Sequence, residues 1–179
     1  MLTMEQRLKN LEIPTGPVDM VLDTDAYNEI DDQFAISYAL HATEKLNVLA
    51  LYAAPFFNNR SSSPADGMER SYQEILKLLR LSKLECPVYR GSDRYLPDEQ
   101  TPVASDAAKH LTELAMRYSP EKPLYVVAIG AITNVASALL MKLGKIDMVF
   151  ISADRVVGNG DVAAKIGVYG IAICAKEHG

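Results

Sequence analysis

The sequence predicts an α/β fold in which a parallel sheet carries helices on both faces. Short apolar segments alternate with helix-like segments along the whole chain, which is the pattern of a parallel sheet with crossover helices. Most of the apolar segments are apolar on both faces, as expected for strands that are covered on both sides. With 179 residues, 49% of them hydrophobic, residues 1–179 are expected to form a single α/β domain.

The first part of the chain predicts strand, helix, strand and loop in that order. Residues 18–22 (VDMVL) and 47–54 (NVLALYAA) are apolar runs that read as buried strands. Residues 31–40 between them have helical spacing. The apolar side chains on or near one face of that helix are Phe34, Ile36, Ala39 and Leu40. Residues 58–67 (NNRSSSPADG) are expected to be a polar loop.

The central part continues the alternation. Residues 68–81 are strongly amphipathic and predict a helix, and residues 87–90 (PVYR) predict a short strand. Ser105 is a good N-cap for a helix that runs to about residue 118. Residues 124–129 (LYVVAI) predict another buried strand.

The last part predicts a tight turn at 130–133, a helix at 134–141, a strand at 147–151 and a final helix at 163–176. In folds of this class, ligands bind at the carboxyl ends of the strands. The residues that follow the strands are therefore the candidates for a site. They are Asp23, Asp25, 55–59, 91–94, 130–133 and Asp154.

Composition limits the classes of function. The chain has 23 acidic and 18 basic side chains and a net charge of −5, which argues against nucleic acid or an anionic membrane as the main partner. We find no apolar run that could cross a bilayer and no secretory signal, so a cytoplasmic protein is expected.

Cys86 and Cys174 are expected to be buried free thiols of a reducing compartment. Surface or helix positions are expected for His41, His110 and His178.

A cluster of acidic side chains follows the first strand and opens the first helix. Its members are Asp23, Asp25, Glu29, Asp31 and Asp32. Their mutual repulsion is relieved by a cation, and a hard ion such as calcium or magnesium prefers oxygen ligands. Helix capping within a solvated acidic loop is the alternative. The position at the carboxyl end of a strand favours the metal site.

Four motifs in order resemble the inosine-uridine-type nucleoside hydrolase family over about residues 18–142. They are DTD followed by DD, NVLALYAAPFFNN with the helix MERSYQEILKLL, CPVYRGSDRYL, and LYVVAIGAITNVASAL. The resemblance implies a Rossmann-like, nucleoside hydrolase-like sheet that is truncated, because the chain resembles only the first half of the family. The family's second half supplies another calcium-binding aspartate and a histidine near the leaving base. The family loop usually reads D-T-D-P-G-x-D-D, whereas AYNEI fills a longer gap here.

The resemblance implies a calcium site. Asp25 and Asp32 would be calcium ligands, and Thr133 would contribute its backbone carbonyl. Asp25 would also orient or deprotonate the attacking water. Asp23 would support the loop without contacting the metal. Carboxylates near an oxocarbenium-like transition state, together with a metal-activated water, suit the cleavage of an N-glycosidic bond.

The resemblance also implies contacts with the substrate, a nucleoside or another ribose-containing small molecule. Asp31 would hydrogen-bond the ribose hydroxyls, and one of Asn58 and Asn59 would contact the ribose. Asn28, in the longer loop, would add a ligand or sugar contact.

Residues 145–179 resemble a second family, the methylthioribose-1-phosphate isomerases and the related regulatory subunits of translation initiation factors. The matching segment is KIDMVFISADRVVGNGDVAAKIG. Asp154 matches a proton-transfer aspartate and Lys165 a substrate-binding lysine, while Ala164 replaces the family's asparagine. Taken alone, this strand-loop-helix segment is also explained as a simple connection. Asp154 is a further candidate for the missing calcium aspartate.

The chain is therefore expected to be a chimera of a hydrolase-like part, residues 1–144, and an isomerase-like part, residues 145–179. A join near residues 141–146 would keep one continuous sheet. The expected function is calcium-dependent hydrolysis of the N-glycosidic bond of ribonucleosides, weak or lost in the truncated chain. The alternatives are a non-catalytic chimeric or engineered α/β scaffold and a sugar-phosphate isomerase fragment. A homo-oligomer through an open sheet edge is also expected.

Overall fold

The computed structural model describes residues 12–141 and, in addition, residues 5, 8, 150–151, 155–156 and 162–163. Its strands are β1 (Val18–Thr24), β2 (Leu46–Ala53), β3 (Val88–Arg90), β4 (Tyr125–Ala128), β5 (Phe150–Ile151), β6 (Arg155–Val156) and β7 (Val162–Ala163). Its helices are α2 (Ile30–His41), α3 (Pro64–Ser82), α4 (Asp106–Ala115) and α5 (Thr133–Met141). None of the described helices is both long and apolar enough to span a membrane.

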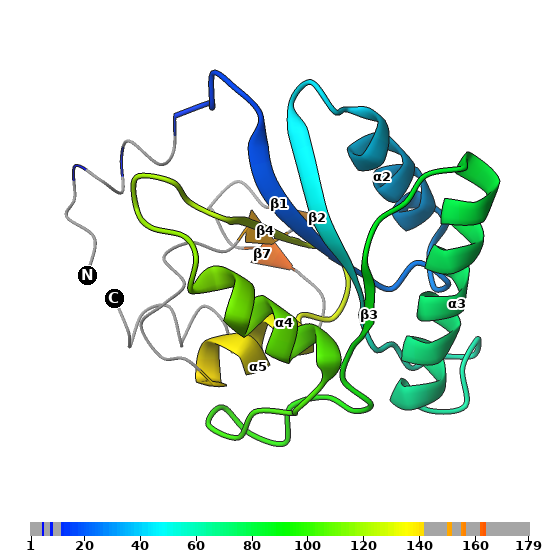
Figure 1. Ribbon diagram of the computed structural model, residues 1–179. Coiled ribbons are helices and arrows are strands. Elements are labelled where there is room, and N and C mark those ends of the chain that lie inside the picture. Colours follow the sequence, from blue (N-terminus) through cyan, green and yellow to red (C-terminus); the bar gives the residue numbers. More distant parts are fainter. Residues whose placement is uncertain are drawn as a thin grey trace.

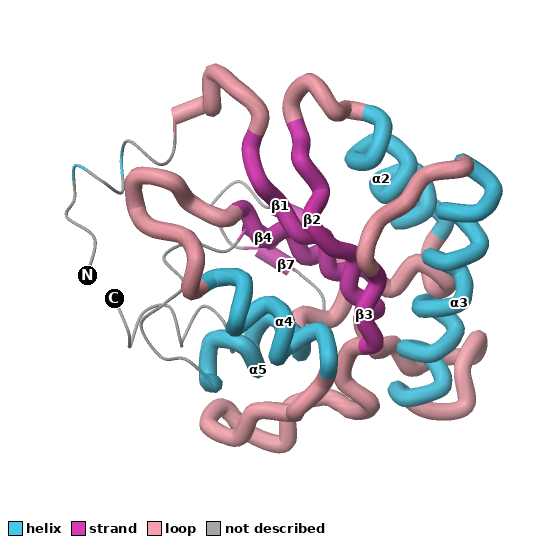
Figure 2. The backbone as a smooth tube through the Cα atoms, in the orientation of Figure 1, coloured by secondary structure: helices cyan, strands magenta, loops and turns pink. Residues whose placement is uncertain are grey.

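A parallel sheet of five strands forms the centre of the molecule, in the order β3-β2-β1-β4-β5. Helices α2 and α3 lie on one side of this sheet and α4 and α5 on the other (Figure 1). The tube in Figure 2 shows the strands side by side with the helices outside them. The predicted fold class, a parallel sheet with helices on both faces, is confirmed.

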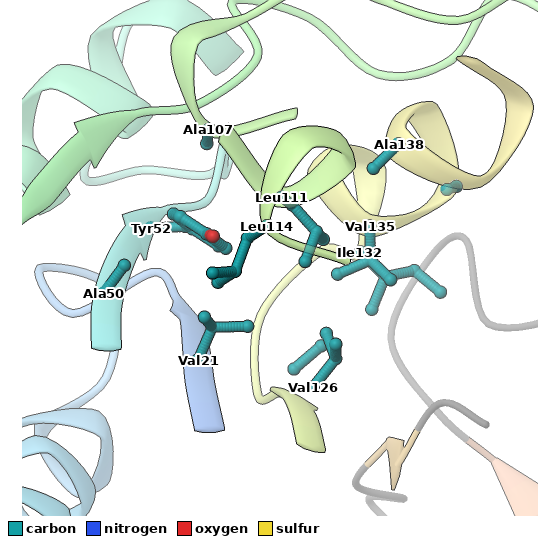
Figure 3. Packing of buried hydrophobic residues seen from close by; sticks show 12 residues of the cluster. Val21, Ala50, Tyr52, Ala107, Leu111, Leu114, Val126, Ile132, Val135 and Ala138 are labelled. Carbon is teal, nitrogen blue, oxygen red and sulfur yellow. The ribbon is translucent and has the colours of Figure 1, made fainter. Parts of the chain in front are cut away.

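The alternating side chains of β1 connect the two halves of the core. Val21 packs with residues of α4 and α5, whereas Met20 and Leu22 pack on the opposite face with residues of α2 and α3. Val21, Tyr52 and Leu111 meet in the first of these clusters (Figure 3). Burial of Met20, Val21 and Leu22 on both faces of the strand explains why the centre of the segment is apolar in the sequence.

Helix α3 begins earlier than the sequence predicted. The polar loop was expected to reach residue 67, but Ser63 is the N-cap and its Oγ accepts a hydrogen bond from the Asp66 amide at 3.1 Å. Pro64 occupies the first helical position, where its missing N–H costs nothing. Ser63 and Pro64 therefore begin a helix and do not belong to the loop. The predicted cap of α4 is confirmed, since Ser105 Oγ accepts from the Ala108 amide.

The predicted buried face of α2 is correct except for Phe34. Ile36 and Ala39 are buried, but Phe34 is 70% exposed. Together with Ile30 and Tyr38, also exposed, it lies on the outer face of the helix, because residues four apart share a face. The inner face uses Asp32, Ile36 and Ala39 instead.

Strand β5 pairs in parallel with β4 and so continues the sheet beyond α5. This agrees with the expectation that the two parts share one sheet. The predicted last helix, 163–176, is wrong at its first residue, because Ala163 belongs to β7 and pairs antiparallel with Arg155 of β6. The rest of that helix, and Asp154, Lys165, Cys174 and His178, lie outside the described residues.

His110 and Cys86 were expected to have no functional role, and the structure shows what surrounds each of them. His110 of α4 is half-buried, its Nδ1 lies 2.8 Å from the Tyr52 hydroxyl, and its ring stacks on Tyr89 with centroids 4.1 Å apart. Desolvation lowers the pKa of His110. Cys86 is a partly buried free thiol whose pKa burial raises to about 11, as expected for an unreactive cysteine.

Candidate metal and ribose site

The carboxyl ends of the central strands meet at one edge of the sheet. The amide of Ala54, just after β2, donates to the Thr24 carbonyl at 2.8 Å, and the amide of Ile129, just after β4, donates to the Asp23 carbonyl at 2.9 Å. The acidic loop after β1 therefore leaves the sheet between the loops that follow its two neighbours. This is the position at which open α/β sheets bind ligands.

Asp23, the next-to-last residue of β1, is the most deeply buried acid of the cluster, with no exposed surface. Its Oδ1 accepts a hydrogen bond from Asn134 Nδ2 at 2.8 Å, while its Oδ2 is buried with no hydrogen-bond partner in the described part of the chain. The pKa of Asp23 is raised to about 7, chiefly by burial and also by the charges of Asp25 and Asp32, while the hydrogen bond from Asn134 opposes the shift. A buried oxygen in this state is a position for a cation or a proton.

Asp25 is 2% exposed, and it is held from two sides. Its Oδ2 accepts from Asn28 Nδ2 at 2.9 Å. A Cβ at Gly130 would lie 2.9 Å from its Oδ1, so the turn after β4 needs glycine to admit the carboxylate. The longer loop AYNEI thus supplies Asn28, the residue that orients Asp25.

Asp32 is also 2% exposed and accepts a hydrogen bond from the Thr24 hydroxyl. The carboxylates of Glu29, Asp31 and Asp32 bring one oxygen each within 4.8 Å of one another. The sequence predicts roles for two of these three, Asp31 and Asp32, and Glu29 is an acidic neighbour of both. Thr133 lies at the start of α5 and is 6% exposed.

The predicted sugar-binding residues fall on two loops that bond to each other. Asn58 Nδ2 donates to Asn28 Oδ1 at 2.6 Å, and the Arg60 guanidinium donates to the Asn28 carbonyl. Asn58, Asn59 and Asp31 are exposed. The structure therefore brings Asn28 and Asn58 together beside Asp25, and the loop after β2 is anchored to the acidic loop.

Sequence reasoning missed Asn134, Ser92 and Tyr95. Asn134 is fully buried and bonds Asp23, and Ser92, also fully buried, donates to Asn134 Oδ1 through its amide at 2.7 Å. Burial raises the pKa of Tyr95, and the charge of Asp25 adds to this effect. Ser92 stands in the segment noted after the third strand, and Asn134 one residue beyond the noted turn.

The residues present fit a hard cation. Every charged donor of the cluster is a carboxylate oxygen, and Asp23 Oδ2 is buried with no hydrogen bond from the described residues. Calcium and magnesium are bound by this kind of donor set. A hollow of about 760 Å³ lies elsewhere, beside Val18, Asp19 and residues 120–123. That position is the amino end of β1, and the cluster is at its carboxyl end.

Comparison with known proteins divides the chain in two. Residues 20–149 match the family described as inosine-uridine preferring nucleoside hydrolase, and residues 125–179 match the initiation factor 2 subunit family. The matches overlap around the join that the sequence predicted, which is consistent with a chimera.

Curated relatives match the C-terminal part. The methylthioribose-1-phosphate isomerase of Synechococcus sp. (strain CC9902) is 54% identical over 53 residues, which are 30% of this chain and 16% of the isomerase. The putative isomerase of Pyrococcus furiosus is 52% identical over 51 residues, 28% of this chain and 14% of that protein. The chain spans about a sixth of the length of these relatives.

Solved structures share the fold of this chain. An inosine-guanosine nucleoside hydrolase has a TM-score of 0.62 and 21% identity and covers 90% of this chain and 56% of its own. The type III effector protein XopQ, complexed with adenosine diphosphate ribose, has a TM-score of 0.58 and 20% identity over 96% of this chain and 56% of its own. The chain spans about half the length of these proteins. Because the hydrolase match at residues 20–149 covers more than half of the chain, the protein belongs to the inosine-uridine preferring nucleoside hydrolase family.

Proposed function

We propose that the chain binds calcium at the acidic loop after β1 and hydrolyses the N-glycosidic bond of ribonucleosides there. One observation carries the proposal. Asp23, Asp25 and Asp32 are each at least 98% buried at one strand end, an arrangement of like charges that is costly without a cation. Membership of the hydrolase family supports the reaction type.

Asp25, Asp32 and the Thr133 carbonyl would hold the ion, as the resemblance implies. A bound calcium ion supplies positive charge that binds oxygen ligands and acidifies water. Asp25, oriented by Asn28, accepts the proton of the attacking water. The water oxygen bonds to C1′ while the C1′–N bond breaks, and the base leaves with the bonding electrons and takes up a proton.

Asp31, Asn28, Asn58 and Asn59 would bind the sugar. The bond between Asn58 and Asn28 supports a shared role for the two loops, because it places the amide groups beside the acids. A ribose-containing ligand also agrees with the adenosine diphosphate ribose bound by the XopQ structure. Hydroxyl groups of the ribose would compete for these amides and carboxylates, which are strong hydrogen-bond partners.

A ribose-release assay tests the proposal. We expect the wild-type chain to release ribose from purine or pyrimidine ribonucleosides with calcium and not with a chelator, and Asp25→Asn to lower the rate at least about 100-fold. The matched 2′-deoxynucleosides should react more slowly, because they lack a hydroxyl that the site binds. Calcium binding without ribose release would leave the non-catalytic scaffold as the function, and release that a chelator does not affect would contradict the metal requirement.

A further inference from the structure

Asn134, the second residue of α5, has its side-chain amide saturated with hydrogen bonds and has no exposed surface. Its Nδ2 donates to Asp23 Oδ1 at 2.8 Å and to the Ala53 carbonyl at 3.1 Å. Its Oδ1 accepts from the amide and the hydroxyl of Ser92 at 2.7 and 3.0 Å. An amide side chain offers two donors and two acceptor positions, so these bonds use all of them, and the Ser105 hydroxyl donates to the same Oδ1 at a longer 3.4 Å.

The partners also fix which way the amide points. The Asp23 carboxylate and the Ala53 carbonyl accept hydrogen bonds, so they must face the NH₂ group. The Ser92 amide donates, so it must face the oxygen. A flipped amide would lose its bonds to the Asp23 carboxylate, the Ala53 carbonyl and the Ser92 amide inside the core, where unpaired polar groups are costly.

The four elements that meet at Asn134 are the ends of the strands that build the candidate site. Asp23 belongs to β1, Ala53 to β2, Ser92 follows β3, and Asn134 itself follows β4. Gly91 leaves room for the Asn134 side chain, because a Cβ at Gly91 would lie 2.4 Å from Asn134 Nδ2. Only glycine lets the segment after β3 approach so closely.

We infer that Asn134 is the positioning residue of the site, which holds the Asp23 carboxylate and the loops after β1, β2 and β3 at the spacing that metal binding requires. This inference rests on the proposed function. Asn134 acts through Asp23 and Ser92 and does not itself bind the ion. Residues that orient the groups around a metal typically contribute about 10- to 100-fold to its affinity.

Calcium titration of Asn134→Ala, with Ser137→Ala as the control, tests the inference. Ser137 is fully buried on the same helix, and its hydroxyl accepts from the Val103 amide at 3.0 Å, away from the strand ends. Asn134→Asp is the second variant, because it keeps the size and the acceptor for Ser92 and loses the donor to Asp23. Thermal unfolding of all three variants shows which of them fold.

We expect both Asn134 variants to weaken calcium binding about tenfold or more, and Ser137→Ala to change it less than about twofold even where its thermal midpoint falls. Equal weakening in Ser137→Ala, or unchanged affinity in a folded Asn134 variant, would overturn the inference. If the wild type binds no calcium, the proposed function fails, and hydrogen exchange decides the inference alone. Faster exchange at residues 23–30 and 91–96 in the Asn134 variants but not in Ser137→Ala supports it, and unchanged exchange there overturns it.

Discussion

Single side chains at the strand ends of this protein are fixed by partners that lie far away in the chain. Asp23 and Asn134 are 111 residues apart, and Ser92 and Asn134 are 42 apart. The sequence predicts Asp25 and Asp32 as site residues, because an acidic cluster that follows an apolar strand and opens a helix is visible in it, and this assignment stays a prediction. Asn134 could not be predicted, because its role follows from three separate strand ends that only folding brings together.

Gly91→Ala should destabilise the fold and disturb the site. The added Cβ would lie 1.9 Å from the Ala53 carbonyl oxygen and 2.4 Å from Asn134 Nδ2, and overpacking of this kind costs about 1–3 kcal/mol. Gly16→Ala is the matched control, because nothing lies within 4 Å of its added Cβ. Urea unfolding measures both, and equal stability of the two variants would show that the close approach at Gly91 is not needed.

Asp19 gives the fold a dependence on pH. Hydrogen bonds from Asn47, Tyr118 and Lys122 hold the pKa of Asp19 below its ordinary value of 3.8, with Asn47 the largest cause. A lowered pKa means that the stabilisation is fully present above about pH 3.8 and is lost as the pH falls through the lowered pKa.

The Asp19→Asn variant should therefore be less stable than the wild type near neutral pH. The difference in the free energy of unfolding should shrink as the pH falls below about 3.8. Urea unfolding of both proteins at several pH values measures it. A difference that stays constant over this range would contradict the ionised role of Asp19.

At the scale of the elements, apolar residue type and spacing predicted where the helices lie better than which face of each is buried. The helical spacing predicts Phe34 on or near one face with Ile36, Ala39 and Leu40, but Phe34 lies on the exposed side of α2. Asp32 takes a place on the inner face of α2 instead, since its carboxylate belongs to the strand-end cluster. The buried face of α2 therefore contains a polar residue of the candidate site, and an apolar residue lies on the exposed face.

Truncation of α2 side chains should distinguish its two faces. Ile36→Ala removes a side chain that is 1% exposed and should cost about 2–5 kcal/mol. Phe34→Ala removes a larger side chain that is 70% exposed and should change stability by about 0.5 kcal/mol or less. Chemical denaturation compares them, and a larger loss for Phe34→Ala would mean that the outer face of α2 is covered.

The cap of α3 offers a test at a helix end. Ser63→Ala should lose about 1 kcal/mol, because the Asp66 amide loses the hydroxyl that accepts its hydrogen bond. Ser63→Asp should keep most of the stability, since a carboxylate accepts the same bond and favours a helix N-terminus. Thermal unfolding measures both variants, and an unstable Ser63→Asp would assign the effect to something other than capping.

On the scale of the whole molecule, one sheet joins segments that match two families. β1 lies at its centre, so the acidic loop has a neighbouring strand end on each side. The alternation of strands and helices predicted this sheet, and strand order followed only from the structure. The division into parts at residues 1–144 and 145–179 stays a prediction. So does a homo-oligomer, and the edge strand β3, three residues long and ending in Arg90, has features that oppose edge pairing.

Calorimetric titration with calcium of the wild type, Asp25→Asn and Asp19→Asn tests the central claim most directly. Asp19 is the matched control, because it lies on the same strand about 15–20 Å from the acidic loop. We predict binding at about micromolar affinity or tighter in the wild type and in Asp19→Asn, and its loss in Asp25→Asn. Equal binding by all three proteins, or none by the wild type, would contradict a calcium site at the carboxyl end of β1.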